Sequence, residues 1–296
     1  MKKIKFKGER TRSTLIIAAA LIVFLVSICT NFRIGYTLII AAVAPMATYE
    51  LMHACGVKSK LLYIVSCAVS AFSAFYVSYD IPIKPVGVIV SFYTLALLFL
   101  AVIFNKQIKY IDSVVSLFAG VAIPYSFTCL IRLNDISKLD PEKLTHHEGT
   151  FLVMLAFSCS WATDIFAFLV GRKIGKHKMT PNISPKKSFE GAIFGTLITA
   201  AVNVLLLFCY SYGTHELGYH AFFGKSAMKY IYIIPISCVL SVVSMFGDLA
   251  ASVLKRNVGI KDYSNLLPGH GGIMDRFDSS LFVLPVLYGI YALIYA

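Results

Sequence analysis

Nine apolar runs divide this chain, and they constrain its fold more than any other feature of the sequence. Each run has roughly 16–21 residues, which as a helix is long enough to cross a hydrocarbon core of about 30 Å. The runs cover residues 13–29, 34–52, 61–79, 86–104, 111–131, 151–170, 190–210, 229–247 and 280–296. Charged residues make up only 14% of the chain, against about 25% in soluble domains. The sequence therefore predicts an all-α, polytopic integral membrane protein with about nine transmembrane helices.

The lysines and arginines between the runs indicate how the chain is oriented. If the N-terminus lies inside and the runs alternate, 20 of the 27 basic residues fall on the inner side, as the positive-inside rule requires. We therefore expect the N-terminus and the loops after the sixth and eighth runs to face the cytoplasm. The short chain without a soluble extension favours a bacterial plasma membrane. Topology and attraction to anionic lipid explain the net charge of +12, so no nucleic-acid partner is expected.

Polar residues are unevenly distributed along the chain. Through residue 150 the runs hold few ionisable side chains apart from Glu50 and Asp112, whereas polar residues become dense from residue 151 onward. We therefore predict a transmembrane scaffold over residues 1–150, with about five helices. A functional region with about four helices and two inner-face loops is expected over residues 151–296.

Four aspartates lie at or near the inner ends of the last runs. Asp164 lies within the sixth run, Asp248 ends the eighth, and Asp275 and Asp278 precede the ninth. A charged side chain at the bilayer centre costs about 2.5–3.5 kcal/mol on insertion scales, so such residues usually serve a function. Gathered carboxylates repel one another unless a cation joins them, and ligands with oxygen alone suit Mg²⁺. We expect a magnesium site, while pairing of each acid with a local base, such as Asp164 with Arg172, remains the alternative.

The first inner loop, residues 171–191, holds six basic residues among glycines and prolines, so its backbone is expected to turn. Residues 184–191 favour the entry to the next helix, with Ser184, Lys186 and Lys187 beside its N-terminus. Free N–H groups and the helix dipole attract anions there, so we predict a phosphate site. An ordinary inner-face role explains the loop's other bases equally well.

The second inner loop, residues 252–280, combines bases, acids and glycines. Its candidate residues besides the acids are Lys255, Arg256, Lys261, His270, Gly271, Gly272 and Arg276. Arginine can hold a phosphate through two hydrogen bonds, glycine lets the backbone approach a ligand, and the histidine can donate to a phosphate or relay a proton. Lysines and Mg²⁺ neutralise a polyphosphate while acids hold the metal. The loop therefore indicates phosphoryl chemistry at the level of the lipid headgroups, where a lipid can itself be a substrate.

These residues follow the signature of a known family. The matching positions are Ser252, Leu254, Lys255, Arg256, Lys261, Asp262, Ser264, Leu267, Pro268, His270, Gly271, Gly272, Asp275, Arg276 and Asp278. The chain thus resembles the phosphatidate cytidylyltransferases, also called CDP-diacylglycerol synthases. The segments SPKKSFEG at 184–191 and WATDIFAFLVGRKIGKHK at 161–178 resemble the family's two other blocks, although Phe168 stands where tyrosine is more usual.

The resemblance implies a nucleotidyltransferase of phospholipid biosynthesis that converts CTP and phosphatidic acid to CDP-diacylglycerol and pyrophosphate. It also implies Mg²⁺, with a second metal ion left open, and a homodimer in the membrane. With this family in view, the expected catalytic residues are Asp248, Asp275, Lys255, Lys261 and His270. The expected metal ligands are Asp248, Asp275, Asp278 and Asp164. The expected substrate-binding residues are Ser184, Lys186, Lys187, Lys255, Arg256, Gly271, Gly272 and Arg276.

Two alternatives remain open at this point. A few residues around the lipid pocket could direct a CTP-using enzyme to another acceptor, such as an isoprenoid alcohol or an ether lipid. A transporter would also carry acids in its spans, but it favours polar groups at the bilayer midplane. Here they gather toward one face, which favours an enzyme.

Overall fold

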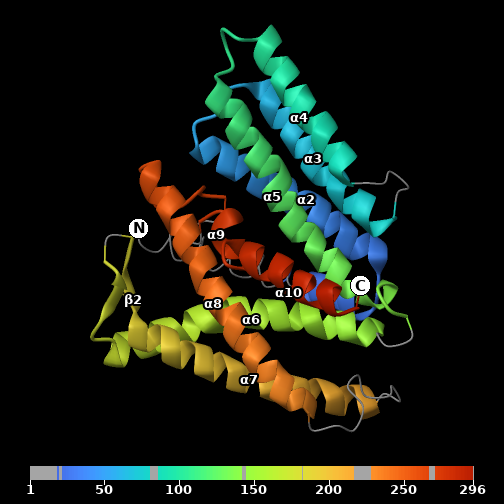
Figure 1. The fold of residues 1–296 in the computed structure, drawn as a ribbon, viewed down its shortest axis with the longest axis vertical. Coiled ribbons are helices and arrows are strands. Elements are labelled where there is room, and N and C mark those ends of the chain that lie inside the picture. The colour runs from blue at the N-terminus through green and yellow to red at the C-terminus, as the bar shows by residue number, and fades with distance from the viewer. Residues whose placement is uncertain are drawn as a thin grey trace, which may run out of the picture. The chain divides into compact units, whose positions relative to one another are not determined.

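The computed structural model describes residues 19, 22–80, 86–141, 145–181, 183–216, 228–266 and 271–295. Within them, six helices are long and apolar enough to cross a membrane (Figure 1). These are α2 (Arg33–Ala54), α3 (Lys60–Ser78), α5 (Tyr110–Asn134), α6 (His146–Ile174), α7 (Phe189–Glu216) and α8 (Met228–Asn257). Two apolar helices are shorter, namely α4 (Val86–Ile103) and α10 (Ser280–Tyr295). The protein is therefore a largely helical integral membrane protein.

The count of about nine spans stays a prediction. The first predicted run, 13–29, begins outside the described residues, and its part from residue 22 to 29 is helical. The remaining elements are short: the 3₁₀ helix η1 (Ile136–Lys138), the one-turn helix α9 (Met274–Phe277) and two strands.

The structure differs from the all-α prediction in the first inner loop. Strand β1 (Lys178–Thr180) pairs antiparallel with β2 (Ser184–Ser188), and α7 begins only at Phe189. The segment expected to open a helix therefore runs as a strand first. Glu190 ties the connection between α6 and β1 to the first turn of α7, because its carboxylate accepts hydrogen bonds from the backbone N–H groups of Lys176 and His177. The His177 ring nitrogen Nδ1 also lies 2.6 Å from Glu190 Oε1.

The chain forms two compact units. One comprises the described residues up to Arg132 together with Asn257–Phe277, and the other comprises Leu133–Arg256 together with the described residues from Asp278. These units are defined by which residues pack together. The predicted boundary at residue 150 separates a scaffold from a functional region, and it stays a prediction.

In the first unit, α2 packs against α3, and buried hydroxyl groups join the helices. The Tyr93 hydroxyl of α4 lies 2.8 Å from Ser66 Oγ of α3 and donates to the Ser116 carbonyl of α5 at 2.7 Å. Such hydrogen bonds between helices supplement van der Waals packing, because the hydrophobic effect does little to drive helix association within lipid.

In the second unit, α6 and α7 run side by side (Figure 1). Glycines allow this close approach: a Cβ on Gly191 would lie 2.5 Å from the Ala167 carbonyl oxygen, and one on Gly195 would lie 2.8 Å from the Ala167 nitrogen. A capping box formed by Thr145 and Glu148 begins α6. The glycines thus let the C-terminal part of α6 and the N-terminal part of α7 pack closely beside the hairpin.

Candidate active site

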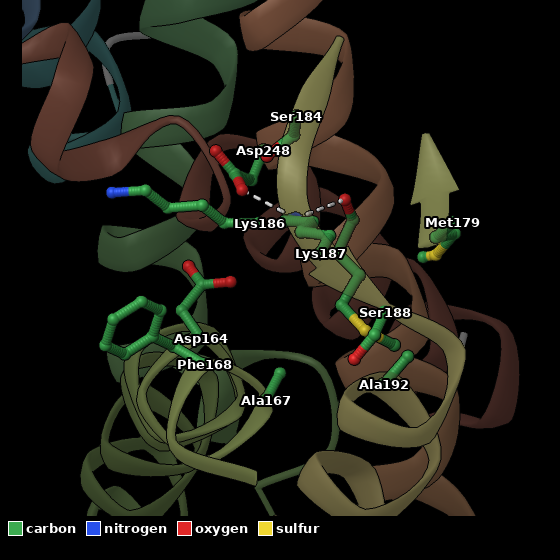
Figure 2. A pocket seen from close by; sticks show the side chains of 11 residues that line it. Asp164, Ala167, Phe168, Met179, Ser184, Lys186, Lys187, Ser188, Ala192 and Asp248 are labelled. Atoms are coloured by element: carbon green, nitrogen blue, oxygen red, sulfur yellow. Dashed lines mark hydrogen bonds and ion pairs between the residues drawn. The ribbon is translucent and has the colours of Figure 1, made fainter. Parts of the chain in front are cut away.

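A cavity of about 290 Å³ lies in the second unit, where α6, β2, α7 and α8 meet (Figure 2). Its volume is at the lower end of the range of about 300–1,000 Å³ for ligand sites. Its lining residues are Asp164, Ala167, Phe168, Met179, Ser184, Lys186, Lys187, Ser188, Ala192, Met245 and Asp248. Five of them, Asp164, Ser184, Lys186, Lys187 and Asp248, were candidates from sequence. The fold thus brings acids and bases separated by up to 84 positions to one cavity.

Lys187 and Asp248 form the closest charged pair in the cavity. The Lys187 Nζ atom lies 2.6 Å from Asp248 Oδ2, and it also donates to the Met245 carbonyl at 3.4 Å. Their side chains are 18% and 25% exposed, so the pair is partly shielded from solvent. The pair joins the hairpin to α8, and it neutralises Asp248 in this structure.

Lys186 and Asp164 lie in the same cavity, and neither forms an ion pair within the described part of the chain. Figure 2 shows the Lys186 side chain extended away from the Lys187–Asp248 pair, and the residue is exposed. Asp164 Oδ2 accepts a long hydrogen bond of 3.4 Å from Ser279 Oγ. Phe168 follows one turn later on α6, so an apolar ring rather than a hydroxyl lines this part of the cavity.

A second charged pair lies at the start of the last helix. Lys255 Nζ is 3.8 Å from Asp278 Oδ2, and both side chains are 11% exposed. Burial raises the pKa of Asp278 to about 7, and the negative charges of Asp248 and Asp164 add to this effect, while Lys255 opposes it. Asp278 therefore holds its proton more tightly than an ordinary aspartate does.

The carboxylates of the second unit match Mg²⁺ in chemical type, because this ion prefers hard oxygen ligands. Asp164, Asp248 and Asp278 also lie close enough for their charges to act on one another. In the described part of the chain, however, no three His, Cys, Asp or Glu side chains are arranged as a ready metal site. Two of the acids form ion pairs instead, Asp248 with Lys187 and Asp278 with Lys255, and these bases differ from the ones named in the alternative of local pairing.

Asp275 belongs to the first unit and holds its own loop together. Its Oδ2 atom accepts hydrogen bonds from the backbone N–H groups of Tyr263, at 2.8 Å, and Gly272, at 3.0 Å. Gly271 has a φ of +79°, and a Cβ there would lie 2.8 Å from the same oxygen. The glycine therefore permits both the turn and the close approach of this carboxylate.

The remaining candidates lie at the surface or outside the described residues. Arg256, Lys261 and Arg276 are exposed, and His270 lies outside the described residues. Sequence reasoning noted Glu50 only as an acid near a span end, but it is buried and contacts Asn257–Phe277, the part of the second inner loop that belongs to its own unit and is called the signature loop below. A carboxylate within a span is the signal that could have singled it out.

Comparison with known proteins identifies the family. A family model described as the cytidylyltransferase family matches residues 9–294, which is nearly the whole chain. The chain belongs to this family. A phosphatidate cytidylyltransferase of Bacillus subtilis (strain 168) is 37% identical over 176 residues, which are 60% of this chain and 58% of that protein.

Other relatives carry the same name. The protein of Staphylococcus haemolyticus (strain JCSC1435) is 38% identical over 143 residues, covering 48% of this chain and 50% of that protein. The protein of Rickettsia bellii (strain RML369-C) is 35% identical over 173 residues, covering 58% and 66%. The chain thus spans between half and two thirds of the length of these curated relatives.

Proposed function

We propose that this protein is a phosphatidate cytidylyltransferase, which makes CDP-diacylglycerol and pyrophosphate from CTP and phosphatidic acid. The observation that carries the proposal is the cavity lined by Lys186, Lys187, Asp164 and Asp248, in a member of the cytidylyltransferase family. The names of the bacterial relatives support the choice of substrates.

The proposed reaction forms one bond and breaks one. A phosphate oxygen of phosphatidic acid attacks the α-phosphorus of CTP, the bond from that phosphorus to the bridging oxygen breaks, and pyrophosphate leaves with the electron pair. Both reactants are anions, so bringing them together is the main obstacle. Lys186 and Lys187 are suited to offset the phosphate charges, and the partly buried setting of Lys187 strengthens its effect.

We further propose Asp248, Asp278 and Asp164 as residues that would hold Mg²⁺. The ion would supply further positive charge to the phosphates. Phosphate binding to Lys187 would release Asp248 from its ion pair, and so make this carboxylate available to a cation. Our expected roles for Asp275, Lys255, Lys261, His270, Arg256, Arg276, Gly271 and Gly272 stay predictions.

The proposed setting is a bacterial plasma membrane with about nine spans and with the N-terminus and active-site loops in the cytoplasm. The apolar helices and the bacterial sources of the relatives support a bacterial membrane. The distribution of basic residues supports the orientation. The homodimer rests on the family resemblance alone.

An acceptor comparison tests the proposed function. The purified protein in detergent would receive CTP labelled in its cytosine ring, Mg²⁺ and one of three lipids: phosphatidic acid, its ether-linked analogue or a polyisoprenol. We expect lipid-soluble cytidine with phosphatidic acid, released together with pyrophosphate. Efficient reaction with only one of the other lipids would identify that lipid as the acceptor in place of phosphatidic acid. A folded protein that is inactive with all three lipids would favour a transporter.

A further inference from the structure

Glu50 is a buried acid that the proposed reaction does not use. It lies in α2, within the first compact unit, and only 4% of its surface is exposed. A buried carboxylate is costly unless hydrogen bonds or an opposite charge compensate it. No lysine or arginine forms an ion pair with Glu50 among the residues that the structure describes, so its compensation comes from hydrogen bonds.

Three donors from the signature loop of the same unit compensate this carboxylate. Ser264 Oγ donates to Glu50 Oε1 at 2.6 Å, and the backbone N–H of Ile273 donates to the same oxygen at 3.1 Å. The backbone N–H of Met274 donates to Oε2 at 2.8 Å. Glu50 therefore ties together two parts of the loop, around residue 264 and at residues 273–274.

Gly272 lies between these contacts and shows how closely Glu50 approaches the loop. A Cβ on Gly272 would clash with both oxygens and with the carboxyl carbon of Glu50. A residue with a side chain would therefore displace either the carboxylate or the backbone. The glycine and the glutamate fit each other, although 222 positions separate them in the sequence.

The Glu50 contacts continue directly into those of Asp275. Met274, which donates to Glu50, precedes Asp275, and the backbone N–H of Gly272 donates to Asp275 Oδ2. The two carboxylates thus accept hydrogen bonds from successive N–H groups, at residues 272, 273 and 274. Glu50 holds the backbone from which Asp275 extends.

We propose that Glu50 is a positioning residue, which fixes the signature loop and thereby the direction of the Asp275 side chain. This inference rests on the proposed function, because it assigns Glu50 an effect on the rate of that reaction. A small misplacement of a reacting group can lower a rate by about 10²-fold. Glu50 should accordingly affect turnover more than substrate binding.

Glu50→Gln is the most informative variant, because it keeps the size of the side chain. In either orientation of the amide, its NH₂ group would face a backbone N–H, of Ile273 or of Met274. Ser264→Ala is a milder variant that removes one of the three donors. Asp112→Asn is the matched control: Asp112 is a buried acid of the same unit that accepts a hydrogen bond from the Lys109 backbone N–H, far in sequence from the loop.

Kinetics and thermal unfolding of the purified variants would be measured together. We expect Glu50→Gln to lower kcat by about 10²-fold, with KM for CTP and phosphatidic acid little changed and a melting temperature similar to that of Asp112→Asn. Gly272→Ala should also lower kcat, and adding Glu50→Asp, whose shorter side chain leaves room for the methyl group, should restore part of it. A wild-type kcat in Glu50→Gln, or a loss that only follows the fraction of unfolded protein, would overturn the proposal.

Hydrogen exchange of the backbone amides separates this inference from the proposed function, because it needs no substrate. We expect Glu50→Gln to speed exchange at residues 272–274, while Asp112→Asn leaves these amides as protected as in the wild type. If the wild type proves inactive with CTP and phosphatidic acid, the proposed function fails and exchange alone decides whether Glu50 fixes the loop. If Glu50→Gln does not fold, Ser264→Ala provides the test, and we expect it to speed amide exchange at residues 272–274 by a smaller amount. Unchanged exchange in the folded variants would refute the positioning role.

Discussion

Lys187 and Asp248 meet at 2.6 Å, and their ion pair links the strand before α7 to the C-terminal part of α8. In a metal-assisted phosphoryl transfer, a cation such as Lys187 can bind the phosphates, and an anion such as Asp248 can bind the metal ion. Without substrate they neutralise each other. In the proposed reaction, binding of CTP and Mg²⁺ would replace this one ion pair by two favourable interactions.

Substitution of either member of this pair should reduce activity. We expect Asp248→Asn to lower kcat by at least about 10²-fold and Lys187→Met mainly to raise KM for CTP, because the former would lose a metal ligand and the latter a phosphate contact. Lys173→Met is the control, since Lys173 is an exposed lysine in the last turn of α6 and does not line the cavity. High activity in the double variant would show that the pair is only structural.

Removal of divalent metal should abolish the reaction. We expect EDTA to stop product formation and Mg²⁺ to restore it, because two anionic reactants need added positive charge. Asp278→Asn and Asp164→Asn should need a higher Mg²⁺ concentration for half-maximal rate. Full activity after exhaustive EDTA treatment would contradict the metal assignment. A variant whose Mg²⁺ dependence equals that of the wild type would show that the substituted aspartate is not a metal ligand.

The raised pKa of Asp278 predicts how pH affects the stability of the metal-free protein. Its value of about 7 exceeds the ordinary value of 3.8, so the folded state binds this proton more tightly than the unfolded state. This contribution to stability is complete below the ordinary pKa and is lost as pH rises through about 7. Melting temperatures in EDTA should therefore fall less steeply with rising pH for Asp278→Asn than for the wild type, and identical slopes would contradict the assignment.

Close packing of α6 and α7 beside the cavity should make Gly195 sensitive to substitution. A methyl group there would lie 2.8 Å from the Ala167 nitrogen, so Gly195→Ala must separate the helices, at a cost of about 1–3 kcal/mol. Gly213 lies on the same helix, and no atom that the structure describes comes within 4 Å of an added Cβ there. Gly213→Ala should therefore leave the melting temperature unchanged or raise it slightly. Equal effects of the two substitutions would refute this account of the packing.

The sequence was sufficient to predict the apolar helices that the structure describes, because length and apolar composition indicate a membrane span. Predicting that Asp164, Asp248 and Lys187 lie near one another was also possible, because each lies at the inner end of a predicted span or in an inner loop. The Lys187–Asp248 pair itself depends on rotamers and on the hairpin. That hairpin was missed because its strands are short and their stability comes from pairing and from Glu190.

The contacts of Glu50 could not be deduced from the chain alone. The residue and its partner Ser264 are separated by 214 positions, and no local pattern connects them. An acid inside a span shows that some compensation must exist, but it does not identify the donors. Gly272 was attributed to ligand approach from its lack of a side chain, and the structure places a protein carboxylate in that space.

Transfer of label from CTP to phosphatidic acid tests the central proposal most directly. Two reactions would run in parallel with purified protein, Mg²⁺ and phosphatidic acid, one with CTP labelled at the α-phosphorus and one with CTP labelled at the γ-phosphorus. We predict that only the α-label enters the lipid, while the γ-label leaves as pyrophosphate. Lipid labelled from the γ-position would show phosphoryl rather than cytidylyl transfer, and no labelled lipid from the folded wild type would contradict the proposed function.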